Sequence, residues 1–301
     1  MDRRDFLQRS TLMTGSALFG HAMAAHSKDQ TVPGYSLKIM ATRWGFKGTL
    51  DDFCKAAREA GYDGIEDWLP SRPEDVEPLL NACAKHGLDY GFLVAGHSSD
   101  FNEHYKQFED MLHRAVAHKP LFINCHSGKD FFSFEQNKKL MDLTSKAVKS
   151  SGVRIYHETH RGRALFAAHI TRSFIENIYD LRLTLDISHW CNVHESLLDN
   201  QKDTIDLALD RTDHIHSRIG HPESPQVTDP RAPEWDKAVK AHVAWWDKVA
   251  EQKKKSGQLL TVTSEFGPAT YMPTVPFTGQ PLANQWEINV YMKDFFRERY
   301  G

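Results

Sequence analysis

The sequence has few cysteines, no long apolar run and no excess of positive charge. Its four cysteines are scattered without a CxxC pair, so neither a disulfide framework nor a zinc knuckle is indicated. The chain contains no run of about 18 apolar residues, so it predicts no transmembrane helix. The 37 Lys and Arg residues against 40 Asp and Glu give a net charge of -3, which disfavours a nucleic-acid partner.

The chain does contain enough apolar material for one large folded domain. Hydrophobic residues make up 40% and aromatic residues 11% of its 301 residues, which excludes disorder for the bulk of it. This length is common among α/β barrels. No Pro- or Gly-rich linker divides residues 36–301, so we expect a single domain there. The 17 histidines are an unusually large number.

The first 25 residues have the parts of an export signal in the right order. The pair Arg3-Arg4 is followed by an apolar stretch over residues 12–19 and by a small-residue cleavage site near Ala24. This pattern resembles a twin-arginine signal, which predicts the twin-arginine export machinery as a partner and a periplasmic or otherwise exported protein. The alternative is an amphipathic first helix. Residues 26–35 would form a linker, and since this route carries folded proteins, it favours one that acquires a metal beforehand.

After the linker, short apolar runs alternate eight times with longer amphipathic segments. Strands are expected at residues 37–43, 64–66, 90–95, 121–125, 153–157, 183–187, 214–219 and 259–264. Helices are expected at residues 50–60, 73–86, 101–117, 134–150, 164–179, 197–209, 233–255 and 281–299. Strands separated by helices pair in parallel, and eight such units predict an α/β fold of the closed (β/α)8 type, a TIM barrel. A doubly wound sheet is the alternative, but no glycine fingerprint favours it.

Polar side chains gather where the predicted strands end, which is where such barrels carry their chemistry. One residue follows or ends each of the last four strands: Glu158, Asp186, His216 and Glu265. Three carboxylates and one imidazole suit one divalent metal ion such as Mn²⁺, Mg²⁺, Co²⁺ or Fe²⁺, which would relieve the repulsion between the carboxylates. Alternatively, each residue is a separate solvated or ion-paired strand end. A zinc-protease HExxH motif is excluded, because Arg161 stands where its second histidine is required.

Further residues near the same strand ends are candidates for contact with a substrate. They are His126, His160, Arg161, His189, Arg218, Trp44, Trp190 and Gln226. Histidine and arginine can hold substrate oxygens, and aromatic faces can stack on the C–H face of a sugar. The alternative for the tryptophans is packing in the core or at the rim. The loop at residues 221–230, which also contains Asp229, is equally well explained as a structural lid.

Four motifs resemble those of xylose isomerase-like barrels, the sugar phosphate isomerase/epimerase group. They are HETHRGR at 157–163, LTLDISHW at 183–190, HIHSRIG at 214–220 and SEFG at 264–267. The resemblance covers essentially the whole chain after the export signal. It implies that Glu158 and Glu265 bind the metal and act as an acid/base pair, with Asp186 and His216 as the other ligands. It also implies that His189 touches the substrate. Arg218 is the nearest match to a substrate-binding arginine of this group, but its spacing departs from that of the epimerases.

The expected function is that of a metal-dependent sugar isomerase or epimerase that acts through an enediolate. Glu158 and Glu265 would remove and return the proton of a carbon next to a carbonyl. No basic cluster stands out as a phosphate clamp, so we expect a non-phosphorylated keto- or aldo-sugar as substrate. The alternatives are a lyase or hydratase acting on a keto-sugar or keto-glycoside, an endonuclease IV-type nuclease, and a non-catalytic sugar-binding protein. A homodimer is the common default, and no stable membrane anchor is expected.

Overall fold

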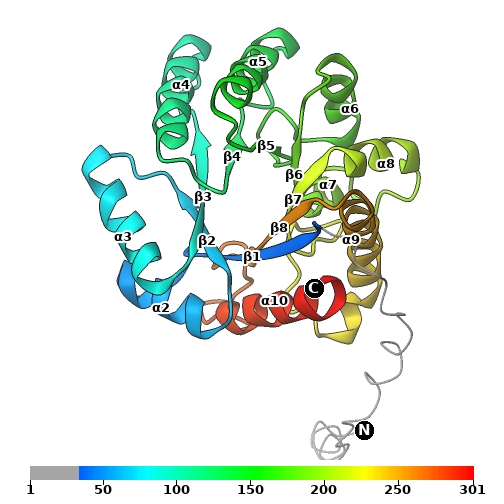
Figure 1. Ribbon diagram of the computed structural model, residues 1–301. Coiled ribbons are helices and arrows are strands. Elements are labelled where there is room, and N and C mark those ends of the chain that lie inside the picture. Colours follow the sequence, from blue (N-terminus) through cyan, green and yellow to red (C-terminus); the bar gives the residue numbers. More distant parts are fainter. Residues whose placement is uncertain (1–33) are drawn as a thin grey trace, which may run out of the picture.

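The computed structural model describes residues 34–301, which form a closed barrel of eight parallel strands (Figure 1). The strands are β1 Ser36–Thr42, β2 Gly64–Trp68, β3 Asp89–Ala95, β4 Phe122–His126, β5 Ile155–Glu158, β6 Leu183–Leu185, β7 Thr212–His216 and β8 Leu259–Ser264. Each strand pairs with the next, and β8 closes the barrel against β1. The predicted single-domain TIM barrel is confirmed. The predicted export signal at residues 1–25 lies outside the described residues.

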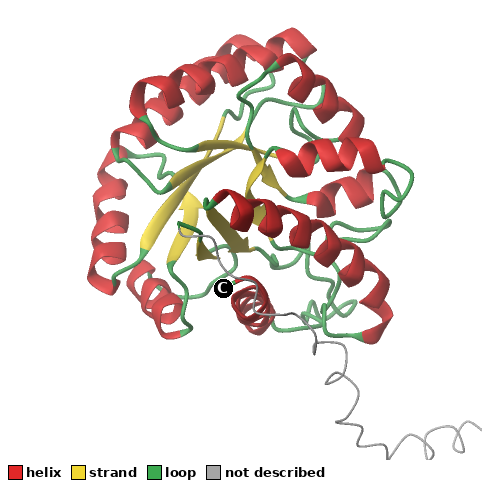
Figure 2. Cartoon of the chain, turned by 45° about the vertical axis from the view of Figure 1, so that its right-hand side comes forward, coloured by secondary structure: helices red, strands yellow, loops and turns green. Residues whose placement is uncertain are grey.

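The helices surround the strands, as the turned view shows (Figure 2). They are α2 Leu50–Glu59, α3 Val76–His86, α4 Phe101–Ala117, α5 Phe134–Ser151, α6 Ala168–Asn177, α7 Ile187–Val193, α8 Lys202–Asp210, α9 Asp236–Ser256 and α10 Gln285–Tyr300. Single turns of 3-10 helix at Pro73–Asp75 and Pro233–Trp235 precede α3 and α9. Within residues 34–301, no helix combines the length and the apolarity that crossing a membrane requires.

Local sequence signals set where several of these helices begin and end. Thr49 and Asp52 form a reciprocal capping box at the start of α2, and Ser133 and Gln136 do the same for α5. α5 is capped at its C-terminus by Gly152, whose φ of 72° lies in the left-handed region that glycine adopts without a steric penalty. These signals explain why most helix positions are predictable from the sequence.

Alternate residues of each strand face the helix layer or the barrel interior. Outward-facing residues such as Ile39 and Ile123 are fully buried in the main core between strands and helices. Met40, Phe122 and Tyr156 have the opposite parity and form a separate apolar cluster inside the barrel. The interior is therefore filled, and the polar chemistry is confined to its two mouths and the layers beside them.

Two predicted strand ends are wrong where they affect the site. The seventh strand is predicted to reach residue 219, but β7 ends at His216, so Arg218 follows the strand. The sixth strand was expected to continue to Ile187, but β6 ends at Leu185 and α7 begins at Ile187. Asp186 is the N-cap of α7, and its carboxylate accepts a hydrogen bond from the Ser188 backbone N–H at 3.2 Å. Because capping turns the chain directly into a helix, the side chains after Ser188 point in helical rather than strand directions.

Candidate metal centre and active site

Four side chains from consecutive strand ends converge at the carboxyl-terminal mouth of the barrel. Glu158 and His216 end β5 and β7, while Asp186 and Glu265 directly follow β6 and β8. One possible ligand atom from each lies within 4.8 Å of the others. The first three of these residues in chain order are fully buried, and the side chain of Glu265 is 12% exposed. The structure thus brings together the four residues that the sequence analysis selected as metal ligands; we refer to them as the carboxylate cluster.

Three atoms of the carboxylate cluster lack a hydrogen-bond partner among the described residues. They are Oε1 of Glu158, Oε2 of Glu265 and Nδ1 of His216, and all three are buried. Nδ1 of His216 lies 2.7 Å from Oε2 of Glu265, but the alignment is not that of a hydrogen bond. Unpaired polar atoms are costly to bury, and one divalent cation between these oxygens and this nitrogen would satisfy them together. The residues present therefore fit a metal ion.

The crowded carboxylates have a marked effect on the pKa values of the cluster. Burial raises the pKa of Asp186 to about 6, although the neighbouring Arg218 opposes this shift. Burial would lower the pKa of His216, but the charges of Glu265, Glu66 and Glu158 outweigh it and raise that pKa well above its ordinary value. The cluster thus attracts positive charge to its centre, and a proton on His216 and a metal ion compete for the same place.

A second polar layer, which the sequence analysis did not assign, lies against this cluster inside the barrel. Oε2 of the fully buried Glu66, from β2, lies 3.1 Å from Nε2 of both His214 and His216. Asn124 donates to Oε1 of Glu66 at 3.0 Å and to Oε2 of Glu158 at 2.8 Å. Burial alone would raise the pKa of Glu66, yet the two histidines hold it far below its usual range. An ionised Glu66 can accept Nε2–H of His216, which leaves Nδ1 directed at the cluster, an arrangement that commonly orients metal-binding histidines.

Arg218 is a buried cation beside the carboxylate cluster. Its guanidinium pairs with Asp186 and lies 3.2 Å from Oε2 of Glu265 and 3.0 Å from Nε2 of His189. Burial would lower the pKa of Arg218, but these two carboxylates raise it, so the side chain remains charged. Arg218 offsets part of the negative charge and also lines the cavity above the cluster, where a substrate would meet it.

Three of the predicted substrate-binding histidines form one wall of the site. Nε2 of His126 lies 2.7 Å from Oε2 of Glu158. The ring of His160 has its centre 4.8 Å from that of His126 and 3.9 Å from that of His189. Burial lowers the pKa of His160 to about 3 and holds the pKa of His189 well below its ordinary value. His160 and His189 are therefore neutral near pH 7; His160 is suited to hydrogen bonding with substrate hydroxyls, whereas His189 is fully buried.

A cavity of about 340 Å³ opens directly above the carboxylate cluster. The predicted Trp44 lines it together with Trp68, and both indole rings are exposed. Tyr271, which the sequence analysis missed, forms part of the same wall, and its ring centre lies 4.6 Å from the guanidinium carbon of Arg218. Tyr271 stands in the irregular loop after β8, where no periodicity signals its position. Arg161 lies at the rim, 5.2 Å from the same ring.

Four predicted substrate contacts do not line this cavity: Arg161, His189, Trp190 and Gln226. Trp190 is fully buried, and its Nε1 donates to the carbonyl of Leu165 at 2.9 Å, because the early start of α7 turns it into the core. Gln226 is also buried, and its amide pairs with both backbone groups of Gly267, at 3.2 Å to the carbonyl and 2.7 Å from the N–H. The last two predictions are corrected: Trp190 packs the core, and Gln226 ties its loop to the segment after β8.

Comparison with known proteins places this geometry in context. The model of the family described as xylose isomerase-like TIM barrel matches residues 54–227. A search of curated protein sequences gives no match.

Three of the solved structures that share the fold illustrate its range. The 3-keto-D-glucoside 4-epimerase from E. coli, in its apo form, has a TM-score of 0.56 and 15% identity over 87% of this chain and 100% of its own. Endonuclease IV from Thermus thermophilus has a TM-score of 0.51 and 15% identity, over 88% of this chain and 98% of its own. The probable 3-DHS dehydratase involved in petrobactin synthesis from Bacillus anthracis has a TM-score of 0.53 and 14% identity, over 88% and 100%.

Proposed function

We propose that this chain, which belongs to the xylose isomerase-like TIM barrel family, is a divalent-metal-dependent isomerase or epimerase of a non-phosphorylated keto- or aldo-sugar. The observation that carries the proposal is the convergence of four ligand-type side chains, with one ligand atom of each within 4.8 Å of the others, three of which have a buried atom without a hydrogen-bond partner. The shared fold of the 3-keto-D-glucoside 4-epimerase is consistent with this choice. The four members of the carboxylate cluster would hold the ion, and when bound it would polarise a carbonyl and its neighbouring hydroxyl.

In this proposal Glu158 and Glu265 move the substrate proton. They come from β5 and β8, and each has one carboxylate oxygen without a hydrogen-bond partner. One removes a proton from the carbon beside the carbonyl, which leaves an enediolate, and the other returns it. Return to the same carbon from the other face gives an epimer, whereas return to the adjacent carbon exchanges aldose and ketose. General acid/base steps of this kind contribute about 10² to 10⁴-fold.

The remaining side chains bind and orient the sugar. Arg218 lines the cavity beside Glu265, where it can donate to substrate oxygens, and His189 is buried behind it, 3.0 Å from its guanidinium. Trp44 and Trp68 offer aromatic faces at the cavity wall, which suit the C–H faces of a sugar. The volume of about 340 Å³ is typical of a small-molecule site and is enough for a sugar.

A lyase or dehydratase reaction is the second candidate function, and the shape of the cavity supports it. The cavity extends past the cluster to Phe46, Trp68 and the ion pair of Arg43 with Asp67, which leaves room for a leaving group. Proton removal by the same glutamates would begin the elimination. The probable 3-DHS dehydratase shows that the fold also carries proteins described in this way.

Deuterium exchange separates the two reactions. The protein is loaded with Mn²⁺ and incubated in D₂O with free keto-sugars and keto-glycosides, and the products are followed by NMR. An isomerase or epimerase incorporates solvent deuterium and yields a stereoisomer or the aldose–ketose partner, whereas a lyase releases water or the aglycone. Absence of exchange with every metal and sugar tested would contradict the proposal. The Glu158→Gln variant is the control for activity that does not come from this site.

We also propose that the protein is exported through its twin-arginine pattern. Replacement of Arg3 and Arg4 by lysine should leave the protein in the cytoplasmic fraction, while the wild type is found in the periplasm. Equal distribution of the two forms after cell fractionation would contradict export by this route.

A further inference from the structure

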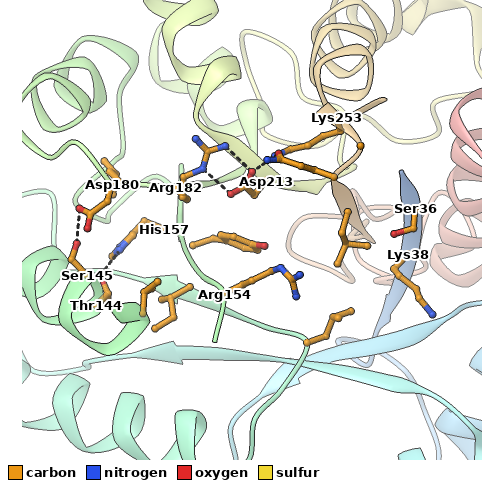
Figure 3. A pocket seen from close by; sticks show the side chains of 18 of the residues that line it. Ser36, Lys38, Thr144, Ser145, Arg154, His157, Asp180, Arg182, Asp213 and Lys253 are labelled. Carbon is orange, nitrogen blue, oxygen red and sulfur yellow. Dashed lines mark hydrogen bonds and ion pairs between the residues drawn. The ribbon is translucent and has the colours of Figure 1, made fainter. Parts of the chain in front are cut away.

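A second cavity, of about 730 Å³, lies at the amino-terminal mouth of the barrel, opposite the carboxylate cluster. Its charged walls come from the starts of several strands and from α9. Figure 3 shows Arg182 and Lys253 grouped around Asp213 on one side and Arg154 across the pocket from them, with Lys38 farther along β1. Nothing in the proposed sugar chemistry uses this cavity.

Strand alternation places three of these cations on the inner face of the barrel. Lys38 stands two residues before Met40 in the same strand, so its side chain faces the same way as that of Met40, which packs inside the barrel. Arg154 precedes Glu158 by four residues, and Arg182 precedes Asp186 by four, so by strand alternation each arginine faces the same side as its carboxylate. The inner faces of β5 and β6 therefore carry a cation at one mouth and a metal-ligand carboxylate at the other.

Four cations line this cavity, and they have two carboxylate partners; a further lining carboxylate, Asp180, pairs with Lys149 at 3.1 Å. Asp213 accepts two hydrogen bonds from Arg182, at 2.6 and 2.7 Å, and also pairs with Lys253. Lys38 pairs with Asp89 at 3.1 Å. Within residues 34–301, the guanidinium of Arg154 has neither a hydrogen bond nor an ion pair. Asp213 is thus shared by two cations, and Arg154 has no carboxylate partner.

Tyr156 supplies an unpaired donor at the same place. Its side chain stacks on Phe122 and His214 inside the barrel, with ring centres 6.0 and 6.2 Å away, and the residue is only 4% exposed. Its hydroxyl has no hydrogen-bond partner in the described part of the chain, and the residue lines the cavity. Burial raises the pKa of Tyr156, so the hydroxyl keeps its proton and can donate it. Because Tyr156 lines the cavity, this donor is available to a bound ligand.

We propose that this cavity binds a small dianionic phosphate, either free or as the phosphate group of a metabolite, through Arg154 and Tyr156. The planar guanidinium presents two parallel N–H donors that match an oxyanion, and the phenol adds a third donor. The two uncompensated positive charges match the charge of a phosphate dianion. Arg182 and Lys253 stay paired with Asp213, so they attract the anion through their positive charge rather than by direct hydrogen bonds. The site lies outside the sugar pocket and takes a ligand class that the carboxylate cluster repels.

Calorimetric titration of the full chain with inorganic phosphate tests this inference. The protein is treated with a chelator first, so that phosphate cannot bind through a metal at the other mouth, and the ionic strength is held constant with chloride. Wild type should bind one phosphate saturably, Arg154→Ala should weaken binding at least tenfold, and Tyr156→Phe should weaken it severalfold. Lys240→Ala is the matched control, because Lys240 lies on α9, is 80% exposed, and neither it nor its neighbour Asp236 lines the cavity; its affinity should equal that of wild type.

A parallel titration with glycerol phosphate distinguishes the two sources. If glycerol phosphate binds more tightly than inorganic phosphate, the site is assigned to a phosphorylated metabolite. If it binds equally or more weakly, the site is assigned to the free ion. Because the side chain of Arg154 makes no hydrogen bond or ion pair with described residues, its replacement should leave the melting temperature without phosphate unchanged. Absence of saturable binding to wild type, or equal binding by wild type and Arg154→Ala, would overturn the inference.

Discussion

The two mouths of the barrel use the same inner strand faces but differ in charge and in burial. The carboxyl-terminal mouth gathers carboxylates whose atoms lack partners, and its residues are buried. The amino-terminal mouth gathers cations that are mostly paired and partly solvated: the side chains of Lys38 and Arg182 are 40% and 32% exposed. Burial makes an uncompensated charge far more costly. The carboxylate cluster should therefore bind a cation tightly, whereas the other mouth should bind an anion only moderately.

The largest expected effect is on turnover, and it should appear at one mouth only. Glu158→Gln removes the carboxylate that the proposal uses to move the proton, so turnover should fall by about 10² to 10⁴-fold. Lys38→Ala, at the opposite mouth, should leave steady-state turnover unchanged. Equal losses in both variants would mean that general destabilisation, rather than the chemistry at the cluster, explains the result.

The pH dependence of stability should reveal the cost of burying the charged Asp186 carboxylate in metal-free protein. The pKa of Asp186 is raised to about 6, above its unfolded value, so the folded state binds its proton more tightly. This contribution is fully present below the unfolded pKa and is lost as pH rises through about 6, at a cost of about 3 kcal/mol. Thermal melts of wild type and Asp186→Asn from pH 4 to pH 7 measure it: the difference in stability should shift in favour of the variant as pH rises. A difference independent of pH would contradict the assignment.

Glu66 should matter for metal affinity rather than for folding. Glu66→Gln weakens the acceptor for Nε2–H of His216, so Mn²⁺ affinity should fall by about 10 to 100-fold in calorimetric titrations. Asp67→Asn is the matched control on the same strand, because Asp67 pairs with Arg43 at the cavity rim instead of with a ligand. If wild type binds Mn²⁺ and Glu66→Gln binds it equally well, the orienting role of Glu66 is wrong, although the metal site itself stands.

The smallest expected effect concerns the aromatic wall. Trp68→Ala removes one exposed aromatic face from the cavity, and stacking of this kind is worth about 0.5 to 1.5 kcal/mol. KM should therefore rise by a few-fold to about tenfold, while turnover changes little. Tyr179→Ala removes another exposed aromatic ring, which does not line the sugar cavity, and should change neither. A fall in turnover without a change in KM would contradict a binding role for Trp68.

Much of the fold is predictable because its signals are local. The bounds of α4 and β8 match the predicted ranges 101–117 and 259–264, since Asp100 caps the helix and the strand is a clear apolar run. The end of β6 is not predictable in this way. There Asp186 is both a candidate metal ligand and the N-cap of α7, and the sequence does not show that the chain turns into a helix directly after it.

The site is predictable where one reactive residue marks each strand end, and not where burial decides. The carboxylate cluster follows from the barrel topology, but Trp190 and Gln226 were assigned to the substrate because the sequence does not show that they are buried. Glu66 was missed because a lone carboxylate in a short strand does not signal that it faces two histidines. The cations of the amino-terminal mouth were missed because Lys38, Arg154 and Arg182 are far apart in the sequence.

Metal binding tests the central claim most directly. Protein purified without chelator is analysed for metals by mass spectrometry and then, after chelator treatment, titrated with Mn²⁺. The account predicts one divalent ion per chain, and saturable uptake at one site that is lost in Asp186→Ala and retained in Lys38→Ala. Protein that carries no divalent metal and takes up no Mn²⁺ saturably, or uptake that is unaffected by Asp186→Ala, would contradict it.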